Sequence, residues 1–494
     1  MDSKFDGSQR EPREIDVATV RKSMHVSIIE GSFALQYMSL TTSTILVGFL
    51  LALGASASQI GLAAALPLLG GIFQPLGSEL IRRMNGWRKG ICVGGVVVDS
   101  ALWLVTIAIC IVLPPSSALI VALLVLALQQ IAINPSALAW TSWVSDLIPP
   151  DVRGRFFSRR NFVIFGLGAI TAVIAGQFID RVGHNEIWSF LAAFAVGVVA
   201  RSISAWFLTK QPEPFPAEHD SSSLISRMIT PFRDPMYRKY LNFTVWWEFS
   251  FYLASPFFAV YMLQSLEVSF GTVAVFAGLT TVANLLTQRY WGRLSDRFGN
   301  QQVLRLTCLI LTLEPLIWLF ARNSGPGFVL IGVLHILGGA ASGGMLLANA
   351  NLMMGLAPLR DQTSFFAIRG ATRGVFASAG PILGGVLLDQ VFGPILSVPT
   401  FLGSGFALLF LIAFVFRSLG WFVLQTVREP IARPHMHPSV LLSEFARSPN
   451  LTQGFSPLLQ AFFVTSDLDD DTIEEAIRKA QAGEERADSR HYSP

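Results

Sequence analysis

The sequence predicts an all-α membrane protein with twelve transmembrane helices in two pseudo-symmetric six-helix halves. Three observations lead to this fold class. Of the 494 residues, 52% are hydrophobic and only 14% are charged, which is typical of a chain whose solvent is lipid. Apolar runs of about 20 residues, the length that crosses a bilayer, recur twelve times along the chain. Finally, parts of the first half recur in the second half in the same order.

The apolar runs set the order of the expected helices. The first 22 residues mix acidic and basic side chains and lack a short apolar core before a cleavage site, so the first run is expected to stay in the protein. The helices are expected near residues 25–52, 58–81, 90–113, 117–143, 160–180, 187–209, 240–264, 268–291, 303–321, 327–352, 365–389 and 399–425. The domains are expected at 1–24 (cytoplasmic segment), 25–209 (first half), 210–239 (polar, Pro-rich cytoplasmic linker), 240–427 (second half) and 428–494 (cytoplasmic tail).

The distribution of Lys and Arg predicts the orientation of the chain. Basic residues gather in the even-numbered loops, whereas the odd-numbered loops hold only Arg181 and Arg322. Because Lys and Arg accumulate on the cytoplasmic side of membranes, both termini are expected in the cytoplasm, and the inner (plasma) membrane is the expected location. The stretch LIPPDVRGRFFSRR, residues 147–160, is then expected to be an inner loop between the fourth and fifth helices.

An internal repeat relates the two halves. A shift of 209 positions lays the stretch at 147–160 on LAPLRDQTSFFAIR at 356–369, so that Arg160 falls on Arg369, and it also lays Asp180 on Asp389. Matches of Pro, Arg, Gly and Asp are less easily made by chance than matches among apolar residues. A second shift, of 215 positions, relates the inner loops that follow the second and eighth helices, and lays Gly77 on Gly292, Arg82 on Arg297 and Asp99 on Glu314.

One of these inner loops resembles a motif of a known family. The segment GRLSDRFGN, residues 292–300, is similar to the Gly-x-x-x-Asp-Arg-x-Gly loop of the major facilitator superfamily. The first-half copy departs from that pattern, with Ile81 in place of the acid and Met84 in place of the second glycine. The resemblance covers about residues 25–427. It implies two halves that rock around a central cavity, with the substrate bound near the midplane of the membrane.

The resemblance also implies an inner gate between the halves. Its motif residues are Gly292, Asp296, Arg297 and Gly299, and Asp296 is expected to reach the positive N-terminal end of the fifth helix. The charge partners expected there are Arg155, Arg159 and Arg160. The alternative is that these arginines only set the orientation of the chain.

Four charged residues lie near the middle of predicted helices, where a charge is costly and needs a partner. At 1.5 Å per residue, Asp99 and Glu314 lie about 14 to 15 Å from the inner ends of their helices. In the superfamily, helices three and six pack together, as do nine and twelve. The resemblance therefore pairs Asp99 with Arg201 and Glu314 with Arg417, either as structural ion pairs or as parts of a proton relay.

Glu30 and Glu248 lie on helices one and seven, which line the cavity in the superfamily. A carboxyl group in such a cavity can load and release protons, because desolvation moves its pKa toward the working pH. These two residues are therefore the candidates for proton coupling. The alternative is that Arg160, Arg369 or Arg373 holds each of them in a structural bridge.

Other polar and aromatic residues fall on helices that line the cavity in the resembling fold. The Asn134–Pro135 step is expected to kink the fourth helix, and His335 is either a proton carrier or a packing residue. No metal-ligand spacing is visible, and Cys92, Cys110 and Cys308 are expected to be core residues. The candidates for the substrate cavity are Gln129, Gln130, Asn134, Trp246, Trp247 and His335.

The tail contains a segment whose pattern fits one short amphipathic helix. Ile473, Ala476, Ile477 and Ala480 share a face, and acidic residues precede them. This helix could dock on the basic inner loops, bind a partner, or remain solvated.

Together these features predict a secondary active transporter of a small organic solute. Alternating access, coupling to protons and export rather than import are expected. No sequence pattern of an ATPase or of a catalytic site is visible, so the chain is expected to be neither an enzyme nor dependent on a cofactor. The expected partners are a small-molecule substrate, protons and the lipid bilayer, without nucleic acid, and the chain is expected to be a monomer. The alternative is a non-transporting sensor or assembly protein with the same fold that signals through its tail.

Overall fold

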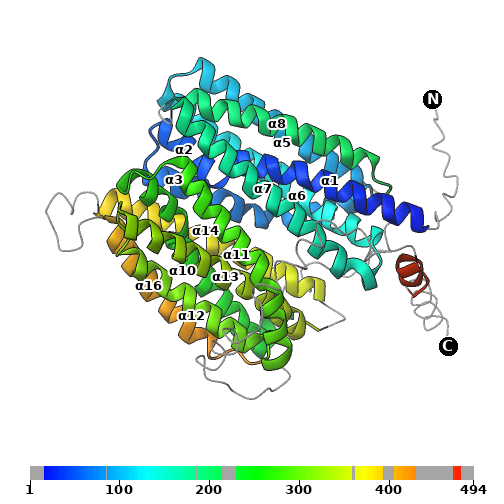
Figure 1. Cartoon of the computed structure of the whole chain (residues 1–494). Helices are drawn as coiled ribbons and strands as arrows, with labels where there is room; N and C mark the ends of the chain where they lie inside the picture. The colour runs from blue at the N-terminus through cyan, green and yellow to red at the C-terminus, as the bar shows by residue number, and fades with distance from the viewer. Residues whose placement is uncertain are drawn as a thin grey trace.

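Figure 1 shows a computed structural model of the protein, a bundle of long helices. The structure describes residues 16–84, 86–183, 186–213, 230–358, 362–392, 405–429 and 471–479. Within these ranges all regular structure is helical. The first 15 residues, positions 214–229 of the predicted linker and most of the predicted tail lie outside the described residues.

The first half makes six passes through the bundle. The first and second passes are each interrupted, the first between α1 and α2 and the second by a short 3₁₀ turn, η1, between α3 and α4. The bounds of the helices are α1 Val17–Thr41, α2 Ser43–Ala52, α3 Ala57–Leu69, η1 Gly70–Phe73, α4 Gln74–Arg83, α5 Arg88–Val112, α6 Pro115–Leu147, α7 Pro150–Val182 and α8 Ile187–Lys210.

The second half makes six more passes among the described residues. Nine of the described helical segments of the whole chain are long and apolar enough to cross a membrane, and the chain is an integral multi-pass membrane protein. Two of the second-half helices end in π-helical turns, η2 and η3. The bounds are α10 Pro235–Val260, η2 Tyr261–Ser265, α11 Phe270–Phe298, α12 Asn300–Trp318, α13 Gly325–Leu356, α14 Gln362–Val386, η3 Leu387–Phe392 and α16 Gly405–Leu424.

The two halves form two layers, with α1 to α8 above α10 to α16 in Figure 1. Within each half equivalent helices pack together, α1 on α7 and α8 in the first and α10 on α14 and α16 in the second. Contact between the halves is made mainly by α3 with α14 and by α7 with α11. We call the end of the bundle where α1 begins the inner end, and the end where α1–α2 finishes the outer end.

The predicted inner loop at 147–160 is wrong, because most of it is helical. Helix α6 ends at Leu147 and α7 already begins at Pro150. Proline suits the first position of a helix, since its fixed φ is helical and its missing N–H would have no partner there. Asp151 in the first turn adds a negative charge at the positive end of the helix dipole. The four arginines therefore lie on the first turns of α7.

Candidate functional site

The halves are joined at the outer end by two carboxylates that cap helices of the opposite half. Asp180, near the end of α7, accepts hydrogen bonds from the backbone N–H groups of Phe270 (2.8 Å) and Gly271 (2.7 Å) at the start of α11. Asp389, in η3 after α14, accepts from the N–H groups of Ala57 (3.1 Å) and Ser58 (2.7 Å) at the start of α3. We call these two contacts the outer caps.

The outer caps are related by the internal repeat. The aspartates are 209 positions apart, and each half supplies one carboxylate and receives the other. The first N–H groups of a helix lack partners within the helix and carry a partial positive charge, so a carboxylate there is favourable. The caps therefore hold the outer end closed in this conformation.

Glycines let α3 and α14 approach closely below one of these caps. A Cβ placed on Gly61 would lie 2.2 Å from the carbonyl oxygen of Pro381, and one on Gly385 would lie 2.4 Å from that of Ala57. Both neighbours are backbone atoms, which cannot rotate away. The close contact between α3 and α14 thus depends on the absence of a side chain at Gly61 and at Gly385.

Replacing Gly61 by Ala is expected to push α3 away from α14 and to weaken closure of the outer end. Overpacking a tight contact typically costs about 1 to 3 kcal/mol. The measurement is the rate at which an impermeant maleimide, added from the outer side, labels a Met38→Cys reporter. Gly94→Ala is the matched control, because no described atom lies within 4 Å of a Cβ at that position. Equal labelling in the two variants would show that the seam does not govern closure.

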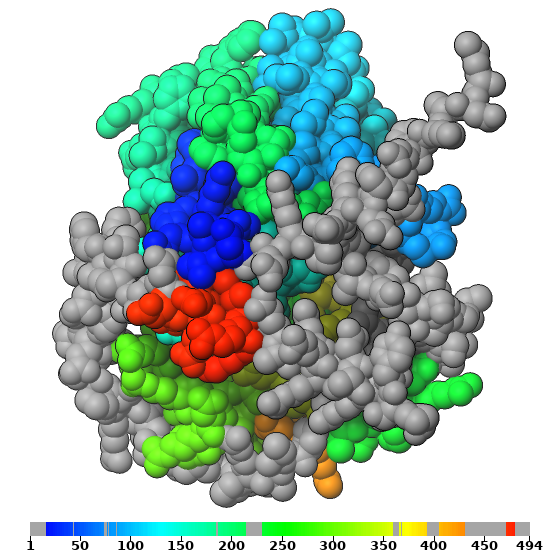
Figure 2. All heavy atoms as spheres, turned by 90° about the vertical axis from the view of Figure 1, so that its right-hand side faces the viewer, coloured from blue at the N-terminus to red at the C-terminus, as the bar shows by residue number. Residues whose placement is uncertain are grey.

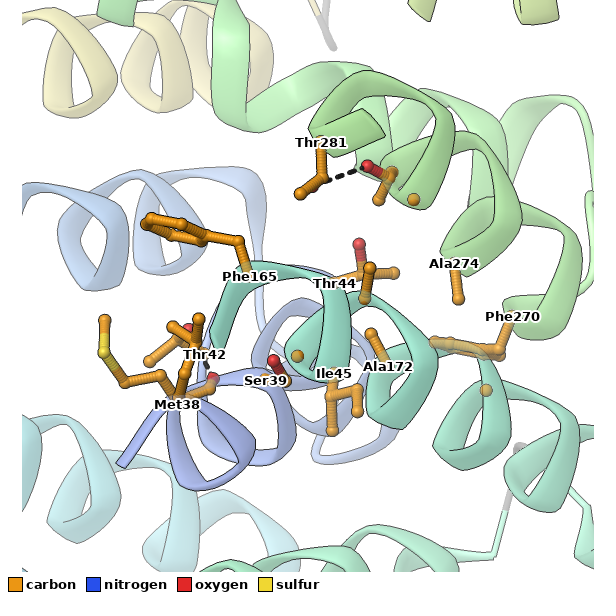
Figure 3. Close-up of a pocket in the computed structure, with 16 residues that line it drawn as sticks. Met38, Ser39, Thr42, Thr44, Ile45, Phe165, Ala172, Phe270, Ala274 and Thr281 are labelled. Atoms are coloured by element: carbon orange, nitrogen blue, oxygen red, sulfur yellow. Dashed lines mark hydrogen bonds between the residues drawn. The ribbon is translucent and has the colours of Figure 1, made fainter. Parts of the chain in front are cut away.

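A pocket lies between the halves beneath the cap that Asp180 makes. It has a volume of about 200 Å³ and is lined by residues of α1, α2, α7 and α11. Figure 3 shows Met38 and Phe165 on one side of it and Phe270 on the other. The N–H of Phe270 donates to Asp180, so the pocket ends at the contact that joins the two halves. We call it the seam pocket.

The lining of the seam pocket is apolar apart from hydroxyl groups. Among the described residues that line it, none is charged, and the hydroxyls come from Ser39, Thr42, Thr44 and Thr281. Thr42 lies at the break between α1 and α2 in extended conformation, and its hydroxyl donates to the carbonyl of Met38 at 2.7 Å. Interrupted helices beside a cavity are where membrane proteins present polar backbone groups to solutes. The pocket can therefore hold an uncharged molecule that makes a few hydrogen bonds with these hydroxyls.

Glu30 is buried inside the first half together with an arginine. Arg160 of α7 approaches it at 3.4 Å, and the hydroxyl of Ser204 on α8 donates to it at 3.0 Å. The Arg160 guanidinium also donates to the carbonyl oxygen and hydroxyl of Ser27 and stacks on the Trp140 ring at 4.9 Å. This cluster ties α1, α7 and α8 together.

Glu248 occupies the equivalent place in the second half. Arg373 of α14 donates to it at 3.1 Å and to the hydroxyl of Tyr252 at 3.1 Å, while Arg369 lies 4.0 Å away. The Arg373 side chain is 36% exposed, whereas that of Arg160 is only 8% exposed. The Glu248 cluster is therefore less enclosed by protein than the Glu30 cluster.

The structure brings together the two pairs expected in the middle of the helices. Arg201 lies 3.6 Å from Asp99, which also accepts a hydrogen bond from the hydroxyl of Tyr37 at 2.7 Å. Arg417 lies 3.1 Å from Glu314. Both pairs cross between helices of one half, α5 with α8 and α12 with α16, so they do not connect the halves.

Comparison with known proteins gives the family. The fold superposes on the crystal structure of a mutant of the nucleoside transporter NupG with a TM-score of 0.65, at 12% sequence identity, over 82% of this chain and 100% of that one. The family model described as Major Facilitator Superfamily matches residues 247–466. The chain has the fold of the major facilitator superfamily, and its second half matches the model of that family.

Curated relatives in this superfamily match only short stretches. The MFS-type transporter TOXA of Cochliobolus carbonum is 32% identical over 124 residues, which are 25% of this chain and 22% of that protein. The efflux pump dotC of Dothistroma septosporum is 24% identical over 132 residues, 26% of this chain and 22% of that one. The matched stretches thus span about a fifth of the length of these relatives.

The superfamily motif lies at the inner ends of α11 and α12. Gly299 has a φ of 92° and ends α11, a backbone conformation that glycine adopts without strain. Arg297 lies over the ring of Phe298, and Asp296 is exposed. A Cβ on Gly292 would meet no described atom within 4 Å, so the close helix contact expected of Gly292 is not made by described residues in this conformation.

The arginines expected beside Asp296 have different surroundings. Arg155 is exposed and Arg159 is half-buried on the first turns of α7. Arg160 is buried and holds Glu30, so its partner here belongs to its own half. An inner gate made by these residues stays a prediction for a conformation with the inner ends together.

Three of the predicted cavity residues lie on α6. Gln129 is buried, and its Nε2 has no hydrogen-bond partner among the described residues. Asn134 donates to the backbone carbonyl of Gln130 at 2.9 Å and packs against Gly70 of η1. Asn134 therefore serves a contact between α6 and η1 within the first half.

The other three cavity candidates also make contacts inside one half. Trp246 donates to the carbonyl of Phe416 at 3.0 Å, and the buried Trp247 donates to the sulfur of Met345 at 3.1 Å. His335 bonds the carbonyl of Ile331 in its own helix, stacks on the ring of Phe276 and meets the ring of Trp318 edge-on, which is the surrounding expected of a packing residue. A substrate role for these residues stays a prediction.

Sequence reasoning missed the capping role of four acidic residues. The repeat related Asp180 to Asp389, yet nothing in that match indicated that each caps a helix of the other half. Near the inner end, Glu213 accepts from the N–H of Lys89 at 2.8 Å and Glu429 accepts from the N–H of Asn300 at 3.2 Å, so each caps a helix of its own half. The spacing of 216 positions between Glu213 and Glu429 is a repeat signal that could have identified this second pair.

Proposed function

We propose that this protein is a secondary active transporter of a small organic solute that works by alternating access. The observation that supports it best is the pair of outer caps, short contacts related by the internal repeat that join the two halves at their outer end. Such contacts can break together without disturbing the packing inside either half. Breaking them would open the seam pocket to the outer side.

The seam pocket supports an uncharged or weakly polar solute as the substrate. Its described lining offers small residues, aromatic rings and hydroxyls rather than charges. Export is the direction we favour, and it agrees with the description of the relative dotC as an efflux pump. We place the protein in the plasma (inner) membrane with both ends of the chain in the cytoplasm, because basic residues gather at the inner end.

Proton coupling is proposed for the two buried carboxylates, with Glu248 as the stronger candidate. A proton on Glu248 would cancel its attraction for Arg373 and release that arginine from α10. The partial exposure of Arg373 gives water a route to this pair. Glu30 is enclosed with Arg160 and Ser204, so we expect it to serve mainly as a structural bridge.

Glu248→Gln is expected to abolish the acceleration of transport by a proton gradient and to leave exchange without a gradient measurable. The measurement is uptake and efflux of amphiphilic and sugar-like compounds in proteoliposomes, with and without an imposed gradient. Glu30→Gln should reduce the amount of folded protein more than it changes the response to the gradient. Glu186→Gln, at the exposed start of α8, is the matched control. Full gradient dependence in Glu248→Gln would rule out coupling through this residue.

The alternative function, a sensor that signals through its tail, is distinguished by deleting residues 431–494. A transporter core should still move its substrate after this deletion. A protein that moves no solute in either form, and whose partners are lost with the tail, would instead fit the sensor.

A further inference from the structure

A short helix of the tail, residues 471–479, packs against the inner end of the first half. Figure 2 views this end of the molecule and shows the helix in red against the start of α1 in dark blue, above the yellow-green atoms of the second half. In Figure 1 the same helix again lies at the inner end, at the level where the two halves meet. Both views therefore place it beside the inner opening between the halves.

The contact is apolar at its centre. Ile473 is 1% exposed and Ala476 is 3% exposed, and both belong to one buried cluster with residues of α1 and α7. Isolated helices shorter than about 12 residues are marginal in water, so these nine residues depend on the packing for their structure. The partners in the cluster include Val20, Met24, Leu147, Val152 and Phe156.

The charges around this contact are complementary. Glu474 lines a hollow with Arg21, Lys22 and His25 of α1, and Lys479 lies 3.9 Å from Asp151 at the start of α7. Lys479 also binds Glu475 at 2.8 Å, and this hydrogen bond lowers the pKa of the Glu475 carboxyl. Exposed ion pairs contribute little to stability, so they orient the helix while the buried isoleucine and alanine hold it.

The docked helix lies on a surface that the second half is predicted to contact when the inner ends come together. The start of α7 is the element that Asp296 of α11 is predicted to reach when the inner ends come together. In the described conformation that start meets the tail helix at Asp151 and shares with it the buried cluster to which Val152 and Phe156 belong. We infer that helix 471–479 is an autoinhibitory segment, which binds the inner end of α1 and α7 and opposes closure of the inner ends.

The inference rests on alternating access but not on the identity of the substrate. It predicts that the tail must leave its site for the inner end to close. A protein without the docked helix should therefore populate the state that is open on the outer side more often. Burial of one isoleucine side chain changes the equilibrium constant between the docked and the undocked tail helix by roughly tenfold or more.

The test compares Ile473→Asp with Ile473→Leu in the full chain. Docking is read from the rate of tryptic cleavage after Arg478 and Lys479 in inside-out vesicles. Ile473→Asp should be cut about tenfold faster than wild type, while Ile473→Leu, which keeps the apolar side chain, should change little. The state of the gate is read from labelling of Met38→Cys by an impermeant maleimide added from the outer side, and this labelling should rise several-fold in Ile473→Asp only.

Two results would overturn the inference. Equal cleavage in both variants would show that the helix is not docked. Faster cleavage of Ile473→Asp with unchanged labelling of Met38→Cys would show that the helix docks without any influence on the gate. Because neither readout uses a solute, both remain informative if the proposed transport activity is wrong.

Discussion

Replacing Asp180 and Asp389 together by Ala is expected to shift the protein from the conformation closed at its outer end to one open there. Each carboxylate accepts two backbone N–H groups of a helix in the other half. Losing a helix cap typically costs about 0.5 to 2 kcal/mol, so losing both should cost about 1 to 4 kcal/mol. This corresponds to a change of about 5-fold to 700-fold in the equilibrium between the two conformations.

Labelling of Met38→Cys from the outer side measures this shift, because Met38 lines the pocket beneath one cap. Cys92 and Cys308 are buried, and replacing all three native cysteines removes any background. The single variants should give intermediate labelling. Asp→Asn, which keeps an acceptor oxygen but loses the charge, should shift the equilibrium less than Asp→Ala. Glu186→Ala, another acid at the outer end, is the control, and equal labelling of it and the double variant would contradict a role of the caps in closure.

Replacing Arg417 by Ala is expected to destabilise the second half by about 3 to 5 kcal/mol, because it leaves the Glu314 carboxylate, whose side chain is only 18% exposed, without its partner inside the membrane. The Arg417 side chain is completely buried and donates to Glu314 at 3.1 Å and to the carbonyl oxygens of Leu311 (2.6 Å) and Phe251 (3.2 Å). The measurement is thermal unfolding of the purified protein, together with the yield of monodisperse protein after size exclusion.

A second change distinguishes the lost charge pair from the lost packing. Arg417→Ala with Glu314→Gln should recover part of the stability, since the glutamine carries no charge. Arg155→Ala is the matched control, because Arg155 is exposed and its loss should change stability little. An Arg417→Ala protein as stable as wild type, or a double variant no better than the single one, would argue against the pair as a structural element.

The fold was predictable from the sequence because lipid imposes a simple pattern on it. In the membrane a helix must satisfy its own backbone hydrogen bonds, so each pass requires a long run of apolar residues in the sequence. The main error lies at α7, where a cluster of four arginines looked like a loop although the helix begins at Pro150. Arginine has a high helix propensity. A cluster of arginines therefore indicates the inner face of the membrane but does not indicate where the helix begins.

The candidate site was less predictable, because its contacts depend on how helices face one another. The pairing of Asp99 with Arg201 followed from depth and the packing of the superfamily, and these residues do lie within 3.6 Å of each other. Trp246 and Trp247, chosen for their position on α10, instead face other helices of their own half. The seam pocket consists mainly of Ala, Gly, Ser and Thr, residue types that carry no distinct signal in a membrane helix.

The docking of the tail helix also has a consequence for how the protein is made. The ribosome completes residues 471–479 only after it has translated every described membrane helix, whereas α1 and α7, to which the helix binds, emerge much earlier. The contact can therefore form only after translation of all the membrane helices, and products that stop short of it lack it. Binding of the tail thus marks a chain whose described membrane helices have all been translated, and before that point the site on α1 and α7 is empty.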